Sequence, residues 1–201
     1  MDDNGISVKK MMSLMAAKVD AIAFSASSEQ IGAFLGGITK AKRVFVMGAG
    51  RSGLVAKSFA MRLMHAGFYS YVVGETITPP ISNEDLFIAF SGSGGTKTIA
   101  DIADTAKSLG AEVALITATP DSRIGKIADY IVKIDTQRDL VIEDEHEYEI
   151  RQMLGAYRSF APLGTLFETA ALIFGDAAIS TLMDMQKIEE SDLKKRHTNI
   201  E

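Results

Sequence analysis

The chain has 201 residues, 47% of them apolar, and a formal net charge of −5 at pH 7. This length predicts one domain with a sizeable core, and an acidic balance without a basic stripe argues against nucleic acid as a partner. Because the chain has no cysteine and only three scattered histidines, disulfides and thiolate chemistry are excluded and a metal centre is disfavoured.

Neither a membrane span nor a signal peptide is expected. No apolar run reaches the ~18 residues that a span needs, and the acidic start MDDNG lacks the basic region of a signal peptide. We therefore expect a cytoplasmic protein with one domain over residues 1–201. Its parts are helices at 1–40, sheet and helices at 41–135, an acidic excursion at 136–161, and a helix with its tail at 162–201.

Residues 7–39 carry apolar side chains at helical spacing, with Ser27, Ser28 and Glu29 forming a capped restart. This pattern predicts two helices before the first strand. A helical segment of that kind often packs on a partner chain.

A glycine turn follows the first predicted strand, 43–47, and a helical pattern continues to about residue 66. The turn, GAGRSG at 48–53, has the spacing G-x-G-x-x-G, and Glu75 follows Gly53 by 22 residues at the end of the next strand, 69–73. A dinucleotide site therefore stays open as an alternative. A P-loop is excluded, because no Lys-Ser/Thr pair follows Gly53 at the required spacing.

The second glycine turn, at 91–96, lies between the predicted strand 85–90 and a helical pattern at 98–109. It interleaves three hydroxyls with three glycines: Ser91, Gly92, Ser93, Gly94, Gly95 and Thr96. Glycines let backbone amides face inward, and the start of a helix favours an anion. The turn predicts a phosphate monoester site. The alternative is an ordinary Ser/Thr helix cap, which needs only one hydroxyl.

Two more strands, 112–117 and 130–134, flank a short predicted helix at 122–128. Five near-continuous apolar strands that alternate with helices indicate an α/β fold, with a parallel sheet covered on both faces. Ligands of such sheets bind at the carboxyl ends of the strands, beside the switch in strand order. Both glycine turns are such ends, so they can face one ligand together.

The remaining chain divides into a polar stretch and a long apolar helix. Residues 136–160 are acidic and predict a surface excursion, with a helix at 147–158. The final helix, about 166–185, is apolar on nearly all sides and carries one carboxylate near its start, Glu168.

Three motifs in order, GAGRSG at 48–53, SGSGGT at 91–96 and PLGTLFE at 162–168, resemble the sugar isomerase (SIS) domain family. Within that family, RLMHAG at 62–67, VGET at 73–76 and KRHTN at 195–199 are similar to the 6-phospho-3-hexuloisomerases. The resemblance covers nearly the whole chain. It implies a three-layer sandwich around a five-stranded parallel sheet in flavodoxin-like order, preceded by a helical extension.

The resemblance also implies an activity without a metal or an organic cofactor. The 6-phospho-3-hexuloisomerases interconvert 3-hexulose 6-phosphate and fructose 6-phosphate, a step of formaldehyde fixation through ribulose monophosphate or of the reverse route. Moving a carbonyl to the next carbon removes one proton, forms an enediol and returns the proton to the neighbouring carbon, which one carboxylate can do. The resemblance assigns that role to Glu168. The alternative is a carboxylate that only interacts with the helix dipole.

The other candidate residues hold the substrate. Arg51 is expected to contact the phosphate or a neighbouring subunit, and Glu75 either orients a sugar hydroxyl or braces a loop. The full set expected to bind sugar and phosphate is Gly50, Arg51, Ser52, Glu75, Ser91, Gly92, Ser93, Thr96 and His197.

His65 is too far from its own glycine turn to serve it. It lies twelve residues beyond Gly53, which is ~18 Å along a helix, on the side opposite the predicted core face. If it is catalytic, as the resemblance implies, it must enter a neighbouring subunit's pocket. That predicts a homo-oligomer, a tetramer by resemblance, with shared sites. The alternatives are an interface histidine for His65 and a basic terminus for His197.

Two other functions stay open. SIS domains also serve as sugar-phosphate-binding halves of transcription regulators, and related isomerases act on arabinose 5-phosphate or sedoheptulose 7-phosphate. The residues alone do not separate these substrates.

Overall fold

Five parallel strands form the centre of the structure, a computed structural model that describes residues 3–136 and 165–199. The strands are β1 (Val44–Gly48), β2 (Ser70–Val72), β3 (Leu86–Phe90), β4 (Glu112–Thr117) and β5 (Tyr130–Lys133). They lie in the order β2-β1-β3-β4-β5 and every pair is parallel. This confirms the predicted sheet and its flavodoxin-like order. The predicted helix at 147–158 and nearly all of the acidic excursion lie outside the described residues.

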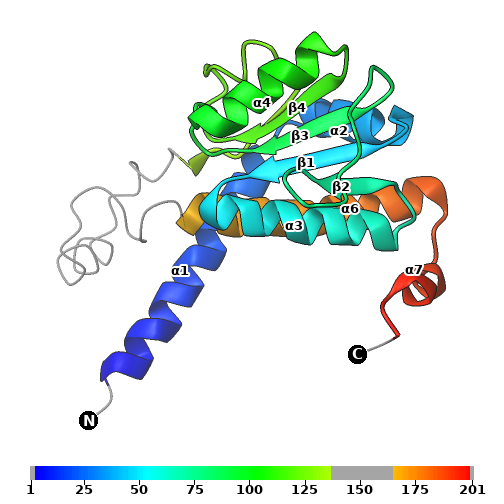
Figure 1. Ribbon diagram of the computed structural model, residues 1–201. Helices are drawn as coiled ribbons and strands as arrows, with labels where there is room; N and C mark the ends of the chain where they lie inside the picture. Colours follow the sequence, from blue (N-terminus) through cyan, green and yellow to red (C-terminus); the bar gives the residue numbers. More distant parts are fainter. Residues whose placement is uncertain (1–2, 137–164, 200–201) are drawn as a thin grey trace.

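Helices cover both faces of the sheet (Figure 1). They are α1 (Asp3–Ser25), α2 (Ser28–Lys40), α3 (Gly50–His65), α4 (Lys97–Ser108), α6 (Thr165–Gln186) and α7 (Glu190–Arg196). One sheet face packs on α4, and the other packs on α2, α3 and α6. Helix α1 extends away from the sandwich in Figure 1. The three layers agree with the predicted fold class.

The prediction of a short helix at 122–128 is wrong, because this segment forms consecutive turns. The chain closes so tightly after Pro120 that a Cβ on Gly125 would lie 1.8 Å from the Pro120 oxygen. The Ser122 hydroxyl accepts from the Gly125 amide at 3.2 Å. The Lys126 and Ala128 amides donate to the Ser122 and Ile124 oxygens at 3.1 and 3.0 Å, so the segment makes single turns that do not continue as a helix.

Alternating strand residues supply two hydrophobic cores. Val44 and Ile88 point to the side of α2, α3 and α6, whereas Phe45 and Phe87 point to the side of α4. Because both sides are buried, the strands appear in the sequence as continuous apolar runs.

Helices α3 and α6 lie side by side and run in the same direction (Figure 1). Arg51 in the first turn of α3 contacts Glu168 in the first turn of α6. Further along, Phe59 packs so closely on Gly175 that a Cβ there would lie 3.3 Å from the ring. Helix α7 then returns to the last turn of α3, where Arg196 Nη1 donates to the His65 carbonyl at 3.2 Å.

Helix α6 differs from the expectation that no segment of the chain is long and apolar enough to span a membrane. Among the described residues it is the one helix long and apolar enough to cross a membrane. Only 44% of its most apolar 18-residue window is buried within the chain. Its inner side packs in the core through Leu166, Ala170 and Ala171, as a core helix of a globular fold does.

A buried ion pair fixes the amino edge of the sheet, opposite the glycine turns. Asp85 is 2% exposed and accepts hydrogen bonds from Arg43 Nε at 2.9 Å and Nη2 at 2.7 Å. The Ser82 amide and hydroxyl donate to the same carboxylate at 2.6 and 2.8 Å. Burial acts to raise the pKa of Asp85, but the bonds from Arg43 and Ser82 outweigh it and hold the pKa below its ordinary value.

We expect Asp85→Asn to lower the free energy of unfolding at pH 7 by about 3 kcal/mol, because it leaves Arg43 without its carboxylate. Because the pKa of Asp85 is lower in the folded protein than in the unfolded chain, ionised Asp85 stabilises the protein at pH values above the ordinary Asp pKa of ~3.9. This contribution to the free energy of unfolding is lost as the pH falls through the pKa of Asp85 in the folded protein. Urea unfolding at pH 7 and pH 3 should show a smaller decline for Asp85→Asn than for the wild type. Glu84→Gln, which breaks an exposed pair with Lys42, should lose at most ~1 kcal/mol. Equal losses for both variants would contradict this.

Candidate functional site

The two glycine turns begin side by side at the carboxyl edge of the sheet. Strands β1 and β3 are neighbours, and Gly48 at the end of β1 is in register with Phe90 at the end of β3. The helices that follow, α3 and α4, pack on opposite faces. The crevice between them is the topological switch point at which such sheets bind ligands.

The loop at 91–96, here called the serine loop, is held in shape by hydrogen bonds to its main chain. Gly92 oxygen accepts from the Thr117 hydroxyl and from the Ala118 amide, both at 3.0 Å. Gly94 has a φ of +58°, and a Cβ there would lie 2.0 Å from the Ser122 hydroxyl. Only glycine satisfies both conditions at this position. The serine loop therefore meets the start of α4 in one fixed conformation.

The serine loop leaves hydroxyl groups without protein partners. Ser91 is 3% exposed, and its Oγ has no hydrogen-bond partner among the described residues. Such a group usually finds a partner in folded proteins. Thr96 is the N-cap of α4, yet its side chain makes no cap bond, which weighs against the helix-cap interpretation. The Ser93 hydroxyl accepts from the Gly95 amide at 3.3 Å and stays exposed.

In the first glycine turn, at 48–53, close packing of the main chain requires glycine at two positions. A Cβ on Gly48 would lie 2.5 Å from the Ser52 oxygen, and one on Gly53 would lie 2.8 Å from the Gly48 oxygen. These two glycines seat α3 on the end of β1. Gly50, the first residue of α3, has a φ of +55°, a backbone conformation that favours glycine even though the space around it is open.

Glu75 does not approach the serine loop through any contact of the described residues. Its carboxylate accepts from Lys57 Nζ at 2.6 Å, and its main chain bonds to Val72 and Thr78 in the loop after β2. Of its two expected roles, these contacts favour bracing the loop. They also occupy the carboxylate that a dinucleotide ribose would need.

The first turn of α6 contacts both glycine turns, through Glu168 and Phe167. Arg51 Nε donates to Glu168 Oε2 at 3.0 Å, and the Glu168 side chain is 13% exposed whereas that of Arg51 is 61% exposed. The neighbouring Phe167 ring lies 3.2 Å from where a Cβ on Gly92 would be. The structure thus pairs Glu168 with Arg51 and places the adjacent residue, Phe167, on the serine loop.

His65 and His197 form a second cluster at the far end of α3. Their rings stack with centroids 5.1 Å apart, and together with Arg62 and Lys194 they line a pocket of about 390 Å³. His65 is 4% exposed because α7 covers it. Burial, and then the nearby His197 and Arg62, lower the pKa of His65, so the ring is neutral at pH 7.

The two clusters are far apart within one chain. His65 follows Arg51 by 14 residues, which is ~21 Å along α3. A sugar phosphate in the serine loop therefore does not reach the histidines of its own chain. Sequence reasoning missed the contact of His65 with His197, because no local pattern links positions 132 residues apart.

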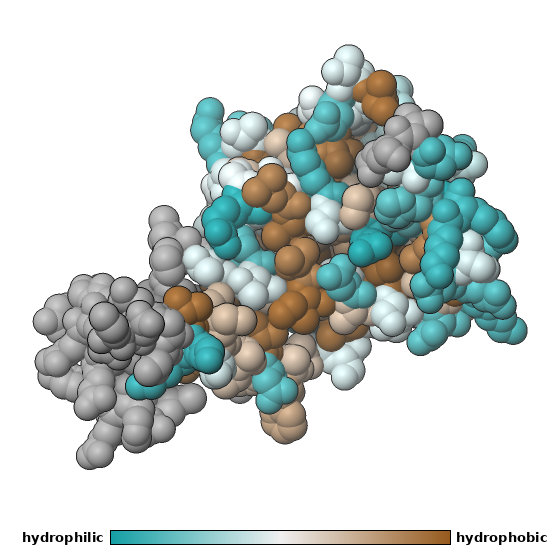
Figure 2. All heavy atoms as spheres, turned by 90° about the horizontal axis from the view of Figure 1, so that it is seen from below, coloured by the Kyte–Doolittle hydropathy of each residue, from teal (hydrophilic) through white to brown (hydrophobic). Residues whose placement is uncertain are grey.

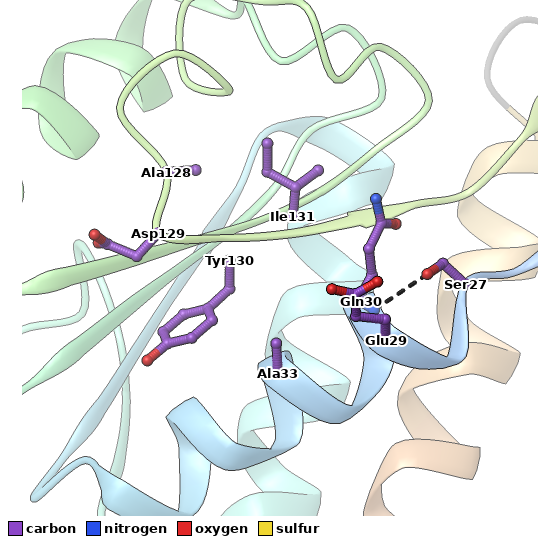
Figure 3. Close-up of a pocket in the computed structure, with 8 residues that line it drawn as sticks. All are labelled: Ser27, Glu29, Gln30, Ala33, Ala128, Asp129, Tyr130 and Ile131. Atoms are coloured by element: carbon purple, nitrogen blue, oxygen red, sulfur yellow. Dashed lines mark hydrogen bonds between the residues drawn. The ribbon is translucent and has the colours of Figure 1, made fainter.

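A further pocket, of about 380 Å³, lies between the start of α2 and the edge strand β5 (Figure 3). Its polar groups are largely bound within the chain. The Tyr130 hydroxyl donates to Glu112 at 3.0 Å, and the Gln30 side chain accepts from the Lys133 amide at 3.1 Å. Because it lies at the sheet edge and away from the switch point, we do not place the site there.

No group of three His, Asp or Glu side chains within residues 3–136 and 165–199 is arranged to hold a metal ion. What the described site offers is hydroxyls, helix-terminal amides, one guanidinium and one carboxylate. These groups suit the binding of a phosphate ester and the movement of a proton.

Residues 37–142 match the SIS domain. The 3-hexulose-6-phosphate isomerase of Bacillus subtilis is 42% identical over 176 residues, 87% of this chain and 89% of its own. The protein of the same name from Mycobacterium gastri is 36% identical over 98% of this chain and 93% of its own. The chain is also similar to a Methanococcus jannaschii protein, for which the crystal structure led to an inferred function of 3-hexulose-6-phosphate isomerase. The two structures superpose with a TM-score of 0.77, and their sequences are 32% identical. The match covers 96% of this chain and 99% of that one.

We expect Ser91→Ala to separate ligand binding from stability. Removing a buried hydroxyl that has no partner should leave the melting temperature unchanged or higher, while the affinity for inorganic phosphate should fall about tenfold or more. Calorimetric titration with phosphate, together with thermal melts, measures both quantities. Thr117→Val is the matched control, since it removes a hydroxyl that is bonded to Gly92 and should lower the melting temperature. Unchanged phosphate affinity in Ser91→Ala would contradict the prediction.

Proposed function

Because the chain belongs to the SIS domain family, we propose that it is an isomerase that interconverts 3-hexulose 6-phosphate and fructose 6-phosphate. The relatives named 3-hexulose-6-phosphate isomerase align with the chain over most of their own length. The observation that carries the proposal is the position of Glu168, a nearly buried carboxylate in the first turn of α6, where the preceding residue Phe167 contacts the serine loop at Gly92.

In this proposal the serine loop binds the phosphate. The hydroxyls of Ser91, Ser93 and Thr96 donate to its oxygens. The first-turn amides of α4 have no helical partners and carry the positive end of the helix dipole, so they add to the attraction. Gly92 lets the backbone and the Phe167 ring approach each other at the loop.

The sugar carbons then extend from the serine loop toward α6. Glu168 removes the proton from C2 while O3 gains a proton, which gives an enediol. The same carboxyl then returns its proton to C3 while O2 loses a proton. The carbonyl is left at C2, which is fructose 6-phosphate. Arg51 holds the carboxylate in place through its bond at 3.0 Å. Gly50 and Ser52 face the sugar hydroxyls from the first turn.

The proposal includes a shared site and a setting in the cell. His65 and His197 lie too far from the serine loop of their own chain, so they act in a neighbouring subunit's site within a homo-oligomer, a tetramer by resemblance. The pathway is formaldehyde fixation through ribulose monophosphate or its reverse, in the cytoplasm, without a metal or an organic cofactor.

A coupled assay distinguishes the proposed function from its alternatives. Enzymatically generated 3-hexulose 6-phosphate should be converted to fructose 6-phosphate, which is detected through NADPH after conversion to glucose 6-phosphate. Arabinose 5-phosphate and sedoheptulose 7-phosphate are tested in parallel. Preferred turnover of either sugar would overturn the substrate assignment, and binding without turnover of all three would favour a regulatory module.

Glu168→Gln should reduce turnover by at least a thousandfold, because the amide keeps the shape of the side chain but cannot take a proton. Binding of fructose 6-phosphate should change less than about threefold, since the phosphate is held by the serine loop. The matched control is Asp184→Asn, an exposed carboxylate near the end of the same helix, which should leave turnover unchanged. Near-normal turnover in Glu168→Gln would refute the role as base.

A further inference from the structure

Two features of the molecule depart from the usual division into an apolar interior and a polar surface. Leu54 on α3 and Ile173 on α6 are 68% and 49% exposed, and Figure 2, which views the molecule from this side, shows hydrophobic side chains in the open. That surface suits the homo-oligomer proposed above. The second feature is Thr117, the last residue of β4, which is polar and yet 0% exposed. A buried hydroxyl is costly unless it is hydrogen-bonded, so its partners indicate its role.

The Thr117 hydroxyl connects β4 to the serine loop. It accepts from the Thr119 amide at 3.0 Å and donates to the Gly92 oxygen at 3.0 Å, which is closer than the Thr119 oxygen at 3.4 Å. The Ala118 amide donates to the same Gly92 oxygen at 3.0 Å. Since a carbonyl oxygen has two lone pairs, these two donors occupy both and fix the direction of the Gly92 carbonyl.

Other carbonyl groups of the serine loop are also bonded within the chain. The Ser91 oxygen accepts from the Gly94 amide at 3.0 Å, and the Gly94 oxygen accepts from the Ile124 amide at 3.1 Å. Three acceptors of the loop, at positions 91, 92 and 94, are therefore occupied by the protein itself. An anion that approaches the loop meets donors rather than these acceptors.

A carbonyl that is fixed in direction also fixes the amide that follows it. In a planar trans peptide unit the C=O and N–H groups point in opposite directions, and the described chain contains no cis peptide bond. The Ser93 N–H therefore points away from the buried Thr117 hydroxyl, and Ser93 is exposed. Within residues 3–136 and 165–199, the amides of Gly92, Ser93 and Thr96 have no hydrogen-bond partner.

We propose that Thr117 is a positioning residue, whose hydroxyl holds the Gly92 carbonyl so that the Ser93 amide faces the phosphate. This inference rests on the proposed function, in which the serine loop binds the phosphate, and adds to it the residue that directs the amides of the loop. Thr117 acts through Gly92 and, because it is fully buried, does not touch the ligand itself.

Two conservative substitutions separate positioning from stability. Thr117→Val keeps the branched shape and loses the hydroxyl, whereas Thr117→Ser keeps the hydroxyl and loses a buried methyl group. Both should lower the melting temperature. Thr117→Val should also weaken the binding of inorganic phosphate about fivefold or more, because one donor then holds the Gly92 carbonyl instead of two. Thr117→Ser should bind phosphate within about twofold of the wild type.

Calorimetric titration with inorganic phosphate measures the affinity, and thermal melts measure the stability. The matched control is Ser70→Ala, which removes a hydroxyl bonded to the Ala60 oxygen at 2.6 Å, at the amino edge of the sheet. It should lower the melting temperature and leave the phosphate affinity unchanged. Unchanged affinity in Thr117→Val, an equal loss in Thr117→Ser, or a wild type that binds no phosphate would each overturn the positioning role.

The kinetics of the sugar phosphate give a second readout. Thr117→Val should raise KM about fivefold and change kcat less than twofold, since its hydroxyl is bonded to Gly92 and Thr119 whereas the described bond of Glu168 is to Arg51. A loss confined to kcat would contradict the positioning role. If the wild type turns over no sugar phosphate, the proposed function fails, and the phosphate titrations still decide the role of Thr117.

An amide NMR titration of the wild type tests the same geometry without a substitution. Saturating inorganic phosphate should shift the Ser93 amide proton at least threefold more than the Gly94 amide proton, because the Gly94 amide is already bonded to the Ser91 oxygen. This measurement decides the question even if Thr117→Val does not fold. A Ser93 amide signal that stays in place while phosphate binds would overturn the proposal.

Discussion

The ion pair between Arg51 and Glu168 connects the parts of the chain that the candidate site needs. It joins the first turn of α3, which follows β1, to the first turn of α6, which lies 117 residues further along. From that point the two helices run in parallel, and Phe167 contacts the serine loop that follows β3. The adjacency of β1 and β3 in the sheet makes this possible. A different strand order would separate the carboxylate from the loop.

Much of this arrangement could be predicted from the sequence, because its signals are local. Apolar runs followed by glycine-rich turns located β1 and β3 with their loops, and the apolar helix with one early carboxylate located α6 and Glu168. The segment after Pro120 was predicted as a helix from a short pattern, whereas it closes tightly on the Pro120 oxygen at Gly125 and forms consecutive turns. The stacking of His65 on His197 depends on the return of α7, which no local pattern encodes.

The glycines of the first turn show that the spacing of a motif does not by itself identify the ligand. The spacing G-x-G-x-x-G suits a dinucleotide site, yet Gly48 and Gly53 are explained by the packing of α3 on β1. Glu75 binds Lys57, while the unpartnered hydroxyl of Ser91 lies at the second turn. Since the buried Ser91 hydroxyl has no partner within residues 3–136 and 165–199, it points to the serine loop as the place for an anion.

We propose that the serine loop binds the phosphate of a sugar whose carbons lie next to Glu168. A crystal structure of the protein with fructose 6-phosphate tests it most directly. We predict the phosphate against Ser91, Ser93 and Thr96, with C2 and C3 of the sugar within contact of the Glu168 carboxylate. An empty serine loop, or an adenine nucleotide lying across the turn at 48–53, would contradict the account.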